Sequence, residues 1–291
     1  MKFYLFFPFL SSLLYVLGVL LIKRASSYGI GVWRTTFISN VSTTLVFLML
    51  LPLGGQPFEW GQLWQPLVVA MLYVGGQALT FRALDVGDVS VATPALGAKT
   101  VFVAWFSTLF LQISLPWQLW ASSILSVTAI ALLNMGGKVR GKPVETILLS
   151  LVAAAFYAMF DVLVQKWSPV WGPGRFLPIM FTFAAVLSLG FVPLFHGPLR
   201  QIPKAAWPTL GGGAFFMGLQ SFILSTAMAI YGEATSMNVI YSARGLWSVI
   251  AVWLVGHWFR NTEQHLGGGV LGLRLLGAAI MTAAIIVTLI R

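Results

Sequence analysis

The sequence contains no cysteine and few charged residues. Without cysteine the chain can hold neither a disulfide framework nor a thiolate metal site. Only 8% of its 291 residues are charged, whereas a soluble globular domain carries about 25%. Too little polar surface is therefore available to cover a water-soluble body of this size. The chain, 58% hydrophobic, is predicted to be an all-α integral membrane protein.

Histidine is also scarce, and its placement argues against a metal. His196, His257 and His265 stand near the ends of predicted helices without ligand spacing, so we expect no metal and no other cofactor. The net charge of +10 would suggest nucleic acid in a soluble protein. Here the basic residues lie mostly in short loops, where they meet the headgroups of membrane lipids. Nucleic acid is not an expected partner.

Catalytic motifs are missing as well. We find no nucleophile elbow and no closely paired carboxylates, so no catalytic residue and no enzyme activity are predicted. The glycine-rich stretch 267–272 fits a dinucleotide pattern, but no strand precedes it and a membrane helix follows. Its Gly268 and Gly272 instead suit close helix packing.

Long apolar runs occupy most of the chain. A membrane-spanning helix needs about 17–25 mostly apolar residues. Charges, prolines and glycine clusters divide the sequence into ten such spans, at 3–22, 31–52, 64–83, 88–111, 116–135, 146–166, 175–195, 206–230, 234–257 and 268–290. The first ends in Lys23-Arg24 without a small-residue cleavage site, which indicates a retained span rather than a signal peptide.

The ten spans form two similar halves. The first repeat comprises residues 1–137 and the second residues 146–291, with a basic linker loop at 138–145. Matching anchors recur 141 to 145 residues apart: Tyr15 with Tyr157, Arg34 with Arg175, Gln77 with Gln220, and Lys99 with Arg244. Because five spans are an odd number, the halves must enter the bilayer from opposite sides. The sequence thus predicts inverted repeats, whose substrate site lies near the midplane between them.

Lys99 and Arg244 lie near the middle of the fourth and ninth spans. A charge at this depth costs from about 2.5 to more than 10 kcal/mol, so two of them need a reason. We predict that they bind an anionic substrate. The alternative is an internal salt bridge with Asp161 in span six, although one carboxylate cannot neutralise both cations. Asp161 could also exchange protons as a coupling residue.

Helical spacing adds neighbours to Arg244. Tyr241 and Ser248 share its face at i−3 and i+4, and Trp247 lies at i+3. Trp247 could bound a substrate pocket or serve as packing. Pro94 removes a backbone donor five residues before Lys99, and the resulting bend would suit a gate.

Three further pairs of polar residues have two readings each. Gln77 and Gln220 could bind substrate or bond to neighbouring helices. Tyr15 and Tyr157 could line the site or pack in the core. Arg34 and Arg175, close to span ends, are better explained by headgroup or loop contacts than by substrate.

The two five-span repeats resemble the drug/metabolite transporter superfamily, in particular its EamA-like members. The matching features are Arg34, Arg175, the alanine-rich third span, Pro94, and Glu263 before the last span. Two departures are visible: no acid precedes the fifth span (112–116), and Val239 stands where the first repeat has Pro94. The resemblance implies a ten-helix carrier that works by alternating access in a bacterial inner membrane.

The central basic pair is also similar to the phosphate-binding pattern of the triose-phosphate and nucleotide-sugar translocators in this superfamily. That likeness maps onto Lys99 and Arg244 alone, because Gly245 stands where relatives often have a second cation. It suggests a phosphorylated substrate without requiring one.

The leading hypothesis is a secondary-active transporter of a small anionic metabolite. Two alternatives remain: an exporter of neutral or amphipathic metabolites such as amino acids, and a flippase or accessory subunit handling a lipid-linked phosphate headgroup. The sequence leaves open a proton or counter-substrate as coupling partner and a homodimer. It also leaves the orientation open, because the basic loops place both termini outside whereas the family places them inside.

Overall fold

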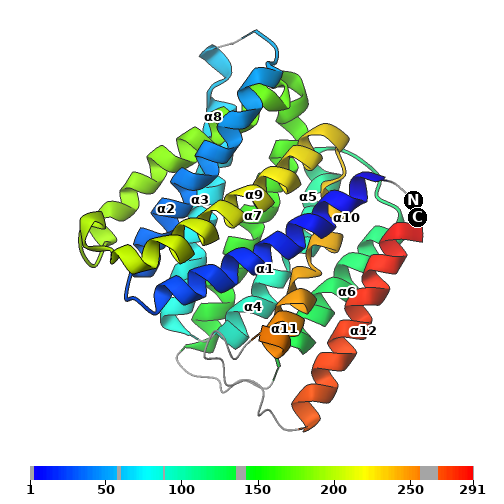
Figure 1. Cartoon of the computed structure of the whole chain (residues 1–291). Helices are drawn as coiled ribbons and strands as arrows, with labels where there is room; N and C mark the ends of the chain where they lie inside the picture. Colours follow the sequence, from blue (N-terminus) through cyan, green and yellow to red (C-terminus); the bar gives the residue numbers. More distant parts are fainter. Residues whose placement is uncertain (1–2, 58–59, 88, 136–141, 256–267, 291) are drawn as a thin grey trace.

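The structure, a computed structural model, describes residues 3–57, 60–87, 89–135, 142–255 and 268–290, and these are built from helices. The long α-helices are α1 (Phe6–Ser26), α2 (Val32–Phe47), α3 (Trp64–Val86), α6 (Trp117–Leu133), α7 (Pro143–Trp171), α8 (Pro173–Leu187), α9 (Trp207–Tyr231) and α12 (Gly268–Ile290). Four short α-helices are α4 (Val89–Gly97), α5 (Lys99–Phe110), α10 (Ala234–Tyr241) and α11 (Arg244–Val255). Each overlaps a predicted span (Figure 1).

Seven helical segments of the described chain are long and apolar enough to cross a membrane. They are Phe3–Ser26, Val32–Leu53, Trp60–Val86, Pro143–Trp171, Pro173–Leu194, Lys204–Tyr231 and Gly272–Ile290. Helix α6 is apolar but only 17 residues long. The remaining two predicted spans, 88–111 and 234–257, are not single helices, because each is divided into two short ones. The count of ten spans therefore stays a prediction.

The two interruptions occur at equivalent places. Ala98 separates α4 from α5, and Ser242 with Ala243 separates α10 from α11. At both points the chain tightens, with Ala98 N–H donating to Ala95 O (3.2 Å) and Ala243 N–H to Ile240 O (3.1 Å). Ser242 Oγ also donates to a carbonyl three residues earlier, which favours a tightened turn. Lys99 and Arg244 each begin the helix that follows.

The prediction that Pro94 bends the fourth span needs correcting in position. Pro94 lies inside α4, and the interruption follows one turn later at Ala98. The second repeat has Val239 at the position equivalent to Pro94, yet it is interrupted too. A proline is therefore not what both breaks require, and a gating role for Pro94 stays a prediction.

Helix starts also repeat between the halves. Gly31 precedes α2 with φ +81° and Gly172 precedes α8 with φ +80°, a backbone conformation that glycine adopts without steric cost. They stand three residues before Arg34 and Arg175 respectively. Helix α7 begins at Pro143, inside the predicted linker, because proline suits a first helical turn. Linker residues 136–141 and Glu263 lie outside the described residues.

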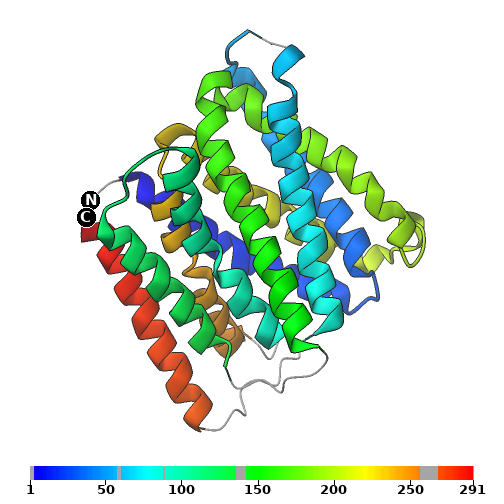
Figure 2. The same ribbon diagram turned by 180° about the vertical axis from the view of Figure 1, so that it is seen from behind.

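Helices of one half pack against helices of the other half in matching pairs. Helix α1 lies along α9, and reciprocally α3 lies along α7 (Figures 1 and 2). Helix α2 likewise packs against its equivalent α8, and α6 against its equivalent α12. In the core between α2 and α8, the rings of Phe47 and Phe181 stack with centroids 3.9 Å apart. The interrupted helices thus lie within a frame of long ones.

Close packing of α1 on α9 leads to a stability prediction. A Cβ added at Gly213 would lie 2.8 Å from Cγ1 of Ile22 and 3.0 Å from its backbone nitrogen, whereas one added at Gly211 meets nothing within 4 Å. We expect Gly213→Ala to destabilise the protein by about 1–3 kcal/mol through overpacking. Gly211→Ala, the matched control, should be neutral or stabilise by up to about 1 kcal/mol. Thermal unfolding in detergent micelles measures both, and equal melting temperatures would contradict the packing argument.

Candidate functional site

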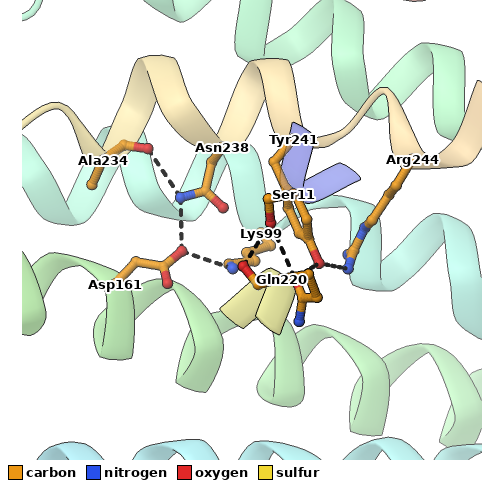
Figure 3. Close-up of polar contacts among 8 residues, drawn as sticks. All are labelled: Ser11, Lys99, Asp161, Gln220, Ala234, Asn238, Tyr241 and Arg244. Atoms are coloured by element: carbon orange, nitrogen blue, oxygen red, sulfur yellow. Dashed lines mark hydrogen bonds and ion pairs between the residues drawn. The ribbon is translucent and has the colours of Figure 1, made fainter. Parts of the chain in front are cut away.

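The central site contains a buried ion pair. Nζ of Lys99 on α5 lies 2.7 Å from Oδ2 of Asp161 on α7. Asn238 on α10 donates to the same oxygen at 2.7 Å, and its amide also donates to Ala234 O at 3.0 Å (Figure 3). The Asp161 side chain is 2% exposed and that of Lys99 15%, so the carboxylate lies behind the ammonium group. Three separate helices converge on this carboxylate.

Arg244 has different surroundings. Its guanidinium carbon lies 4.6 Å from the ring centroids of both Tyr15 and Tyr241. These two rings stand nearly perpendicular, at 79°, and form a corner around the guanidinium. Cation–π contacts of this kind contribute about 0.5–2 kcal/mol each. No carboxylate of the described residues lies within ion-pair distance of Arg244, which remains partly exposed.

A chain of hydrogen bonds continues from Arg244. Its NH1 donates to the Tyr241 hydroxyl at 3.1 Å, and that hydroxyl donates to Oε1 of Gln220 at 2.8 Å. The Gln220 amide nitrogen donates to Ser221 Oγ at 2.7 Å. Ser11 on α1 donates to Gln220 O at 2.8 Å (Figure 3). The network thus joins α1, α9, α10 and α11.

Helix α10 links the ion pair to the arginine network. All eight of its residues are buried. Asn238 contacts Asp161, while Tyr241, three residues later on nearly the same face, contacts Gln220 and Arg244. The first N–H of α10, that of Ala234, donates to Oε1 of Gln165 on α7 at 2.9 Å. A shift of this helix would disturb both groups together.

The other residues predicted for the site do not join the network around Arg244. Gln77 exchanges two hydrogen bonds of 2.9 Å with Asn40. This contact agrees with the alternative in which the glutamine bonds to a neighbouring helix. The Trp247 ring packs edge-on against Phe9 at 5.6 Å, and its Nε1 is buried without a partner among the described residues. Ser248 forms no hydrogen bond with another described residue. Tyr157 packs against Gly76 and against the Tyr73 ring, 6.4 Å away.

Arg34 binds loop carbonyls, as predicted for a residue near a span end. Its Nε donates to Ile30 O and its NH2 to Gly29 O, the latter at 3.1 Å. The side chain of this arginine is thereby occupied within the loop that leads into α2. Arg34 thus bonds within its own loop, whereas Arg244 contacts side chains of other helices.

Sequence reasoning did not select Asn238, Ser11 or Asn40 as functional residues. Asn238 is the one that matters most, since it binds the carboxylate of Asp161. Its signal was an amide within an apolar segment, one helical turn before Tyr241. Asn40 carried the same kind of signal inside the second span.

Apolar helices around a buried set of charges define the class of protein: an integral, multi-pass membrane protein with a polar centre. Residues 2–135 match the model of the EamA-like transporter family. This match, over the first half of the chain, confirms the resemblance to the drug/metabolite transporter superfamily noted from the sequence. The protein is accordingly a membrane transporter.

Solved structures share the fold. Twenty-eight chains match, among them one described only as "Crystal structure of protein". It has a TM-score of 0.72 at 14% sequence identity, over 98% of this chain and 96% of that one. Among proteins of curated function, none matches this sequence.

Proposed function

We propose that the protein is a secondary-active carrier of a small organic anion, with Arg244 as the residue that binds the anionic group. The observation that carries this proposal is the position of Arg244. It lies in the polar centre, partly exposed, with tyrosines around it and no carboxylate of the described residues within ion-pair distance. A buried cation without a counter-charge is costly, so a bound anion would stabilise it.

The carrier in this proposal works by alternating access between two inverted five-span repeats, and the packing of the helices supports this arrangement. The reciprocal packing of α1 with α9 and α3 with α7 is what a pseudo-twofold axis in the membrane plane would produce. The matched breaks before Lys99 and Arg244 agree with it. In such transporters the substrate lies between the repeats, where these residues are. The family resemblance favours a bacterial inner membrane.

Lys99 has a different role in this proposal from Arg244. Its ion pair with Asp161 is the internal salt bridge considered from the sequence, so its charge is already matched. A lysine that is already paired inside the protein is also what the alternative function, an exporter of neutral metabolites, would require. Arg244 lacks an equivalent partner among the described residues, and this difference favours the anion. Asp161, held by two donors, remains the residue through which proton coupling would act.

Counterflow in proteoliposomes tests the proposed function. Vesicles holding the purified protein are preloaded with one unlabelled solute and supplied with the same solute labelled, from a panel of carboxylates, phosphate esters, amino acids and neutral polyols. We expect accumulation of organic anions above the level in protein-free vesicles. Accumulation of neutral solutes alone would show that the proposal is wrong.

A further inference from the structure

We propose that the substrate carries a single carboxylate, and that phosphate dianions are discriminated against. This inference rests on the proposed function and specifies the charge of the group bound at Arg244. It rests on the balance of charges in the polar centre and on the geometry of Arg244, which has no carboxylate partner among the described residues.

Among the described residues, the charged groups of the centre sum to one net positive charge. Lys99 and Arg244 supply two cations, and Asp161 supplies one carboxylate 2.7 Å from the ammonium of Lys99. Glu233, the acid at the start of α10, precedes Arg244 by eleven residues, which is about 16 Å at the rise of an α-helix. Its carboxylate accepts hydrogen bonds from Tyr4 (3.3 Å) and Ser236 (2.8 Å) at the far end of that helix. One further negative charge would therefore neutralise the centre.

The imbalance follows from one difference between the repeats. The offset that relates Tyr15 to Tyr157 places Val19 opposite Asp161. Lys99 on α5 packs against α7 and meets Asp161, whereas Arg244 on α11 packs against α1 and meets Tyr15. Val19 lies one helical turn after Tyr15 on the same face of α1. An apolar residue thus occupies the position from which an acid would neutralise Arg244.

The guanidinium geometry suits a carboxylate. Arginine has five N–H donors in one plane, and the hydrogen bond from NH1 to Tyr241 is the one that the described residues accept. The remaining in-plane donors match the two oxygens of a carboxylate in a bidentate pair. The rings of Tyr15 and Tyr241 lie on two sides of the guanidinium group, and no other hydrogen bond from its N–H donors to a described residue is seen.

A phosphate monoester does not suit this site. It carries a charge of about −1.5 to −2 at neutral pH, so a second free cation would be needed. Lys99 is the second cation of the site, but it is already paired with Asp161, whose carboxylate is 2% exposed and also accepts a hydrogen bond from Asn238. Binding a dianion would leave one negative charge without a partner in a poorly solvated centre.

Matched ligands test the inference on the intact protein. Benzoate and phenyl phosphate share a phenyl ring but differ in charge. Acetate and methyl phosphate make the same comparison with a methyl group, and benzamide is the neutral analogue of benzoate. Binding to the protein in detergent is measured by the ligand-dependent shift in melting temperature, and counterflow is measured in parallel. We expect at least one carboxylate to bind about tenfold or more tightly than its phosphate partner, and benzamide not to bind.

Two substitutions then change the net charge of the site in opposite directions. Asp161→Asn raises the net charge of the site by one. It should lower the ratio of carboxylate affinity to phosphate affinity by about tenfold or more. Val19→Asp supplies the missing acid beside Arg244 and should abolish carboxylate binding, while the matched control Val19→Asn retains it. If Asp161→Asn does not fold, the wild-type ratio and the Val19 pair still decide the question.

The outcomes separate the two proposals. The monocarboxylate inference is wrong if the wild-type protein binds a phosphate as tightly as its carboxylate partner and Val19→Asp still binds the carboxylate as the wild type does. The proposed function as an anion carrier would survive that result. Wild-type protein that neither binds nor transports any anion of either series overturns the proposed function, and the inference falls with it.

Discussion

Replacing Lys99 by methionine is expected to lower the free energy of unfolding by about 3–5 kcal/mol. The substitution keeps an apolar stem of similar length but removes the ammonium group 2.7 Å from Asp161. A carboxylate that is 2% exposed would then have the amide of Asn238 as its remaining described donor. Unfolding in detergent micelles, followed by tryptophan fluorescence, measures the change as a fall in melting temperature.

The double variant Lys99→Met/Asp161→Asn provides the control. Replacing both members of a buried ion pair by neutral groups is often neutral for stability. The side-chain amide introduced in place of the Asp161 carboxylate would still accept the hydrogen bond from Asn238 through its carbonyl oxygen. We therefore expect the double variant to recover most of the loss. If the single and double variants unfold alike, the stability does not depend on the charge of Asp161.

Replacing Arg244 by glutamine is expected to reduce anion uptake by about tenfold to one hundredfold. A hydrogen bond to a charged group contributes about 1.5–3 kcal/mol, and each 1.4 kcal/mol is a factor of ten in affinity. The variant removes the unmatched cation of the site but retains a side chain that can bond to Tyr241. Initial rates of uptake over a range of substrate concentrations measure the effect.

Two other variants show whether charge or geometry is responsible. Arg82→Gln removes the same charge from an exposed position on α3 and should transport as wild type. Arg244→Lys keeps the charge but loses the planar donors, so it should recover only part of the activity. Normal transport by Arg244→Gln would contradict the assignment of this residue to the substrate.

The helical segments follow closely from the sequence. Bounds predicted from apolar runs and punctuation agree with the structure at several ends: α9 spans Trp207–Tyr231 against a prediction of 206–230, and α12 spans Gly268–Ile290 against 268–290. Glycine, proline and charge act locally, so a segment of sequence contains their effect. The divided spans were missed because a one-turn tightening at Ala98 leaves hydropathy unchanged.

Equivalent residues of the two repeats show where local reasoning stops. Gln77 and Gln220 match in sequence, yet Gln77 pairs with Asn40 and Gln220 with Tyr241. The residue equivalent to Asn40 in the second repeat is Phe181, so Gln220 has no matching amide there. The residue equivalent to Tyr241 in the first repeat is Leu96, so Gln77 has no matching hydroxyl. Each glutamine bonds to the polar group that its own neighbours provide.

The sequence by itself determined that this chain is a membrane protein, and it predicted that the two halves repeat and that Lys99 and Arg244 lie near the middle of membrane spans. It also determined that a single acid, Asp161, lies deep in an apolar span opposite Val19 of the other repeat. The tertiary structure alone decided which cation that acid pairs with. Helix α7 packs against α5 and places Asp161 beside Lys99, while α1 brings Tyr15 rather than an acid to Arg244. The attraction between two charges depends on their distance in space, and the number of residues between them in the sequence does not give that distance.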